Sequence, residues 1–175
     1  MKEKTPIRIL KRFSGKTICK HHRENISQKF LPVKRPVTAW AGQKGGIMKY
    51  VGQGHVVFVI EGKLPGLNEY IKACRTGAQV GAQMKKKQQK YVEGFIPKAD
   101  PFTEHVVVKI SYYEPNKRRD PDNISGFARK VIFDALVDVG ILKDDGQDEI
   151  ERIVESWGID KKDPCIIVEI IGKNY

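Results

Sequence analysis

Short apolar runs and one long helical repeat organise most of the chain. Runs rich in β-branched residues predict strands at residues 56–60, 105–113, 150–157 and 165–171. Polar, amphipathic stretches between glycines and prolines predict helices at 68–75, capped by Asn68, and at 79–92. The clearest helix follows Pro121, and its apolar positions recur on one face: Ile124, Phe127, Ala128, Val131, Ile132, Ala135, Leu136 and Val139. Gly140 is a natural end for it.

The order of these elements defines a fold class. With the first two helices counted as one layer, the order is β-α-β-α-β-β. We expect an α/β fold of the α+β type, in which the helices pack on one face of a mixed four-stranded sheet.

The first 47 residues differ from the rest in pattern and charge. They show no sustained period and hold eight Lys and four Arg against two Glu, a net charge of +10, whereas the whole chain has +11. We therefore divide the chain into a basic extension, residues 1–47, and a folded domain, residues 48–175. Met48 is a candidate start of the protein, because Lys44-Gly45-Gly46 can be encoded by a purine-rich ribosome-binding sequence. The alternative is a genuine basic arm that adds DNA affinity.

Targeting signals are missing from the sequence pattern. No stretch approaches the roughly 20 apolar residues that a membrane span needs. Three scattered cysteines argue against a disulfide framework and favour a reducing cytoplasm. We expect a cytoplasmic protein without a membrane partner, and the basic balance suggests a polyanionic one.

Carboxylates cluster around the clearest helix. Asp120 and Asp122 precede and begin it, and Asp144 and Asp145 follow it. Such oxygens suit Mg²⁺, with Mn²⁺ as a possible substitute, and the basic residues Lys117, Arg118 and Arg119 could hold flanking phosphates. Each aspartate pair also has a purely structural interpretation: Asp120 or Asp122 could cap the helix, and Asp144 and Asp145 could belong to an ordinary turn. A helix of this length spans roughly 28 Å, so the two pairs meet only if the chain folds back.

The motifs together resemble a known family. Arg119-Asp120-Pro121-Asp122-Asn123, Phe133-Asp134-Ala135-Leu136 and Val139-Gly140-Ile141-Leu142-Lys143-Asp144-Asp145-Gly146-Gln147 look like the signature of RusA-type Holliday junction resolvases. The earlier Leu64-Pro65-Gly66-Leu67-Asn68-Glu69-Tyr70 resembles their opening loop. The resemblance runs from about Val56 to the C-terminus.

This resemblance implies a fold, an activity and a site. We expect a RusA-like homodimer, common in phages and prophages, that binds four-way junctions and makes paired nicks with Mg²⁺. Asp120, Asp122 and Asp145 match the essential aspartates, which serve as metal ligands, and Asp144 matches a neighbour with a less strict role. Alternatives are a nuclease for flaps or other branches and a junction-binding protein that does not cut.

One position departs from the family pattern. Gly126 stands where the family has an essential lysine, and Lys130 lies one helical turn later. Lys130 precedes Asp134 by four residues, as the family lysine precedes its Asp-Ala-Leu, so we expect Lys130 to be the catalytic lysine. The alternative is a simple i,i+4 ion pair with Asp134. Further basic residues, Lys85, Lys86 and Lys87, line either a DNA path or a solvated helix face.

Overall fold

The computed structural model describes residues 49–52 and 54–173, with the side chain of Tyr50 excepted. Within them lie five strands and three helices: β1 (Lys49–Gly52), β2 (His55–Glu61), α2 (Leu67–Thr76), α3 (Ala78–Glu93), β3 (Val106–Glu114), α4 (Pro121–Asp138), β4 (Ile150–Ile159) and β5 (Cys165–Gly172). The extension of residues 1–47 and the proposed start at Met48 lie outside the described residues.

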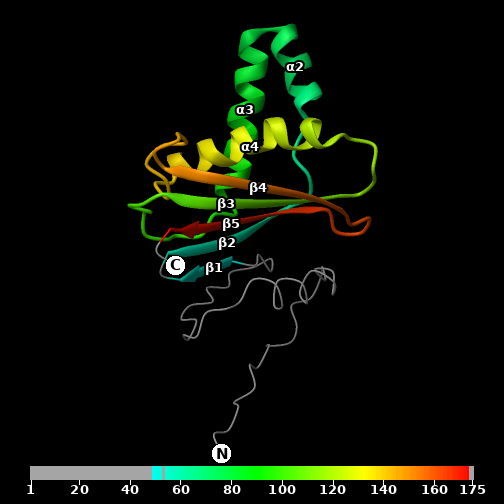
Figure 1. Cartoon of the computed structure of the whole chain (residues 1–175). Helices are drawn as coiled ribbons and strands as arrows, with labels where there is room; N and C mark the ends of the chain where they lie inside the picture. Colours follow the sequence, from blue (N-terminus) through cyan, green and yellow to red (C-terminus); the bar gives the residue numbers. More distant parts are fainter. Residues whose placement is uncertain (1–48, 53, 174–175) are drawn as a thin grey trace, which may run out of the picture.

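The strands form one mixed sheet in the order β1-β2-β5-β3-β4. Only β3 and β4 pair in parallel, and the other neighbours are antiparallel. The three helices lie on the same side of the sheet: α4 runs across it, and α2 and α3 form a hairpin that projects away (Figure 1). The predicted fold class and the one-sided helical layer are therefore confirmed.

The predicted strand count was wrong by one. β1 adds a fifth strand and pairs with β2 from Lys49↔Phe58 to Gly52↔His55. Gly54, directly before β2, has a φ of 64°, a left-handed conformation that favours glycine. The four residues of β1 are too few to show an alternating pattern, so the sequence carries no signal for this strand.

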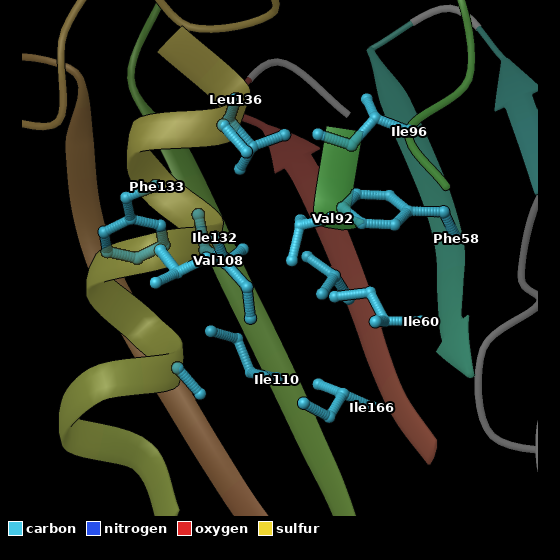
Figure 2. Close-up of a cluster of buried hydrophobic side chains, with 14 of the residues drawn as sticks. Phe58, Ile60, Val92, Ile96, Val108, Ile110, Ile132, Phe133, Leu136 and Ile166 are labelled. Atoms are coloured by element: carbon cyan, nitrogen blue, oxygen red, sulfur yellow. The ribbon is translucent and has the colours of Figure 1, made fainter. Parts of the chain in front are cut away.

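The core lies between α4 and the sheet. β3 alternates strictly between buried and half-exposed residues, as expected for a strand with one covered face. Ile132 and Leu136 of α4 belong to one buried cluster with Val108 and Ile110 of β3 and Val92 of α3, and the Leu136 side chain points toward Ile96 (Figure 2). Burying each such side chain contributes roughly 1.5–3 kcal/mol, which fixes α4 and therefore the motif residues at its two ends.

The helix ends differ from the predicted ones at one cap. α2 begins after Gly66, whose backbone N–H donates to Glu69 Oε2 at 2.7 Å. Asn68, the predicted cap, lies inside the first turn, and its backbone N–H donates to Asn123 Oδ1. Among the described residues, no helix is long and apolar enough to cross a membrane.

Candidate active site

Two of the predicted metal ligands stand at the N-terminus of α4. Asp120 is the N-cap residue, and its backbone carbonyl accepts the N–H of Ile124 at 3.0 Å. Its side chain makes no capping hydrogen bond, so the interpretation of Asp120 as a plain side-chain cap fails. Both Asp120 and Asp122 are exposed, and within the described part of the chain neither carboxylate has a hydrogen bond or ion pair. Their oxygens are open to a cation, and the positive end of the helix dipole favours negative charge there.

Arg119, a predicted DNA-binding residue, has another role. Its guanidinium donates to both oxygens of Glu114, from Nε at 3.0 Å and from the terminal NH2, and its NH1 donates to the carbonyl of Leu64 at 2.9 Å. The Arg119 side chain is 14% exposed and that of Glu114 is 8% exposed. Three of its N–H groups therefore bind inside the protein, where they join the carbonyl of Leu64 to the end of β3, and its assignment to DNA stays a prediction.

The opening loop lies directly against the aspartate motif. Asn123 Oδ1 accepts the backbone N–H of Asn68 at 2.9 Å. A Cβ added at Gly66 would lie 2.6 Å from that same Oδ1 and 3.0 Å from the Asn123 carbonyl oxygen. Only a residue without a side chain permits this approach. Two motifs that are more than 50 positions apart in the chain therefore form one surface.

Gly126, which stands where the family has its lysine, packs against the first residue of α2. A Cβ at this position would lie 3.1 Å from Leu67 Cδ2, which is a tight contact. Leu67 begins α2, so a side chain at Gly126 would require the Leu67 side chain to shift by a few tenths of an ångström. A lysine of this helix finds room one turn later, at Lys130, whose side chain is 54% exposed.

The chain reverses after α4 and returns along it. Gly140 has a φ of 76°, and the backbone N–H groups of Ile141 and Leu142 both donate to the carbonyl of Leu136, at 3.0 and 3.2 Å. Ile141 and Leu142 are buried and anchor the returning segment. This return places Asp145 Oδ2 3.2 Å from the Nζ of Lys130.

Lys130 also contacts Asp134, which in turn binds a lysine of α3. Lys130 Nζ lies 3.0 Å from Asp134 Oδ1, and Lys85 Nζ lies 2.7 Å from Asp134 Oδ2. Burial alone would raise the pKa of Asp134, but the two ammonium groups outweigh burial and the net pKa lies below its ordinary value. The hydrogen bond to Asp134 and the contact with Asp145 raise the pKa of Lys130 in spite of partial burial.

The neighbouring cation on α4 points elsewhere. Arg129 NH1 pairs with Glu155 Oε2 of β4 at 3.2 Å, and Glu155 Oε1 accepts the hydroxyl of Tyr112 at 2.9 Å. Burial raises the pKa of Tyr112, and the nearby Glu155 adds to the shift. Arg129 thus ties α4 to the sheet, whereas Lys130 faces the returning segment.

The three predicted ligands are not brought to one point. Asp145 reaches Lys130, which follows Asp122 by eight residues, about 12 Å along the helix axis. In the part of the chain that the structure describes, no group of three His, Cys, Asp or Glu residues could hold a metal ion. Asp144 shapes the turn, because its Oδ1 accepts the backbone N–H of Asp145 at 2.8 Å. The donor set that fits Mg²⁺ is the open pair Asp120 and Asp122, since this ion takes one or two carboxylates plus water and phosphate oxygens.

The remaining predicted DNA-binding residues are accessible. Lys117 and Arg118 are exposed before α4, and Lys86 and Lys87 are exposed on α3. A groove of about 290 Å³ runs between α3 and α4, lined by Lys85, Lys86, Gln89, Lys90, Glu93 and Asp138. Lys85 differs from its neighbours because it is only 32% exposed and paired with Asp134.

Three residues with a clear structural part were missed as site residues. Asn123 binds the opening loop, Glu114 binds Arg119, and Asp134 binds both Lys85 and Lys130. The four-residue spacing of Lys130 and Asp134 signals their pair, but the contact with Lys85 depends on how α3 packs on α4.

No protein-family model matches the chain, and no curated protein matches it either. The resemblance to RusA-type resolvases therefore stays a prediction from the sequence motifs.

Proposed function

We propose that the protein is a Mg²⁺-dependent endodeoxyribonuclease of the RusA type, which resolves four-way junctions and related branched DNA by paired hydrolysis of phosphodiester bonds. The observation that carries this proposal is the convergence of separate motifs on α4. Asp145 meets Lys130 at 3.2 Å, and the opening loop meets Asn123 at 2.9 Å, beside Asp122. If the motifs were only unrelated turns and helix caps, there would be no reason to expect them to meet on the same helix.

We assign different roles to the aspartates, to Lys130 and to the exposed basic residues. Asp120 and Asp122 would hold the metal together with phosphate oxygens, and Asp145 would hold the ammonium group of Lys130. A bound Mg²⁺ supplies polarisation of the phosphate and a water of lowered pKa. Lys130 adds positive charge beside the reacting phosphate, where preorganised charge typically contributes a few kcal/mol. Lys86, Lys87, Lys117 and Arg118 bind the backbone and carry no base specificity.

A homodimer is part of the proposal. Cuts on two opposed strands need two sites related by a two-fold axis, and a C2 dimer provides them. β4 is an edge strand of the described sheet, and its Val154, Trp157 and Ile159 are exposed to more than 40%.

A second candidate function is a junction-binding protein that does not cut. It is favoured by the lack of a three-residue metal-ligand group in the described residues. Such a protein would bind the junction through the lysines of the groove and would not hydrolyse phosphodiester bonds.

A comparison of substrates tests the proposal. The protein is incubated with Mg²⁺ and end-labelled DNA in three forms of matched sequence: a four-way junction, a flap and a linear duplex. We expect paired nicks on opposed strands of the junction. Preferential cutting of the flap would point to a branch nuclease, and binding without cutting would favour the second candidate.

A further inference from the structure

The ion pairs around Asp134 form a continuous chain across three elements. Lys85 of α3 contacts Asp134 Oδ2, Asp134 Oδ1 contacts Lys130, and Lys130 contacts Asp145 of the segment before β4. The separations are 2.7, 3.0 and 3.2 Å. Asp134 is the central member, and it is the least exposed of the four, with 17% of its side chain open to solvent.

The two oxygens of Asp134 depend on these lysines. Oδ2 is buried and accepts no hydrogen bond of good geometry within the described residues, so its charge is balanced by the ion pair with Lys85. An uncompensated carboxylate at such a site is unfavourable, which holds both ammonium groups against Asp134. Lys130, by contrast, is more than half exposed and its long side chain would otherwise sample many rotamers.

We infer that Asp134 is a positioning residue, which holds Lys130 against Asp145 and Lys85 at the edge of the groove between α3 and α4. The inference rests on the proposed function for its catalytic meaning. Asp134 does not touch the substrate in this account; it acts through the two lysines. It also links Lys85, which lines the groove, to Lys130 on α4.

The chain offers a matched control. Asp138 stands one turn after Asp134 on the same helix and also binds α3, by accepting a hydrogen bond from the side-chain amide of Gln89. It contacts neither lysine within the described residues. Asp134→Asn and Asp138→Asn therefore remove the same charge at the same interface, and only the first disturbs Lys130.

Zero-length crosslinking measures the positioning without any nuclease activity. A carbodiimide joins a carboxylate to an amine that is in direct contact with it, and mass spectrometry of the peptides locates each link. The wild-type protein is expected to give links from Lys130 to Asp145 and from Lys85 to Asp134. Asp134→Asn should lower the yield of the Lys130–Asp145 link severalfold, whereas Asp138→Asn should leave it unchanged. An unchanged or higher yield in Asp134→Asn would overturn the inference.

Kinetics on the four-way junction give the second measurement. Asp134→Asn should lower kcat about tenfold or more and leave KM nearly unchanged, because a displaced catalytic group lowers the rate while the exposed lysines still bind DNA. Asp134→Glu should recover part of the rate, which also covers the case that Asp134→Asn folds poorly. Equal effects of Asp134→Asn and Asp138→Asn would overturn the inference. If the wild-type protein cuts no DNA at all, the proposed function fails, and the crosslinks still decide whether Asp134 positions Lys130.

Discussion

Replacing Gly66 by alanine tests the contact between the opening loop and the aspartate motif. The added Cβ would lie 2.6 Å from Asn123 Oδ1 and 3.0 Å from the Asn123 carbonyl oxygen, so the loop or Asn123 must move. The hydrogen bond from Asn68 to Asn123 would then be lost. The backbone of Gly66, at φ −82° and ψ 167°, is itself acceptable for alanine, so any destabilisation comes from the collision.

The magnitude follows from opposing terms. Overpacking typically costs about 1–3 kcal/mol, and loss of the hydrogen bond adds about 1 kcal/mol. The smaller entropy of an unfolded alanine offsets about 0.4–1 kcal/mol. We expect a net destabilisation of about 2 kcal/mol, or a fall of about 8 °C in Tm for a domain of this size.

Thermal unfolding followed by circular dichroism measures this change, and Gly94→Ala is the control. Gly94 has helical backbone angles, φ −60° and ψ −21°, and a Cβ there meets only the carbonyl oxygen of Tyr91 at 3.4 Å. Its Tm should be unchanged or slightly higher. A Gly66→Ala protein that unfolds at the same temperature as Gly94→Ala would refute the close approach of the opening loop to Asn123.

Three further predictions address the site, its ionisation and its assembly. Lys130→Ala should lower junction cleavage by two to three orders of magnitude, as expected for about 3–4 kcal/mol of transition-state electrostatics. Lys161→Ala, at an exposed lysine between β4 and β5, should change cleavage little, and similar rates for the two variants would remove Lys130 from the mechanism. The wild type should be more stable than Asp134→Asn above about pH 4, and this difference in stability should shrink as the pH falls through the lowered pKa of Asp134. Thermal unfolding at a series of pH values measures the difference, and a difference that does not change with pH would contradict the ion pairs of Asp134. Light scattering at micromolar concentration should give a dimer, and a monomer that still makes paired cuts would exclude the two-fold arrangement.

Local pattern was sufficient for most elements of this fold. The β-branched run of β2 and the apolar face of α4 are long enough to show their periods, and both elements lie where they were predicted. β1 was missed because four residues carry no period. The cap of α2 was misplaced by two positions, because Glu69 binds the N–H of Gly66 and thereby starts the helix earlier than Asn68.

The candidate site was predictable as a set of residues and not as an arrangement. The motifs named Asp122, Lys130 and Asp145, but only the return of the chain after Gly140 shows that Asp145 reaches Lys130. Arg119 was assigned to DNA because three basic residues stand together, and no sequence pattern reveals that Glu114 is buried beside it. Such pairs depend on tertiary packing, which brings together groups with no fixed spacing in the chain.

The contact of Lys130 with Asp145 also bears on the metal. An ammonium that neutralises Asp145 competes with any cation for the same carboxylate. The open oxygens of Asp120 and Asp122 are therefore the first to be available to Mg²⁺, and the Asp122 carboxylate is the most direct target for a test of metal-dependent cleavage.

The most direct test of the central claim is the behaviour of Asp122→Asn on a four-way junction in Mg²⁺, with binding and nicking measured in the same samples. Asp148→Asn is the control, because Asp148 is exposed and has no hydrogen bond or ion pair among the described residues. We expect Asp122→Asn to bind the junction at least as tightly as the wild type, because a negative charge near phosphate is gone, and to make no paired nicks. Asp148→Asn should bind and cut normally. Normal paired nicking by Asp122→Asn would contradict a role of the Asp122 carboxylate in metal-dependent cleavage.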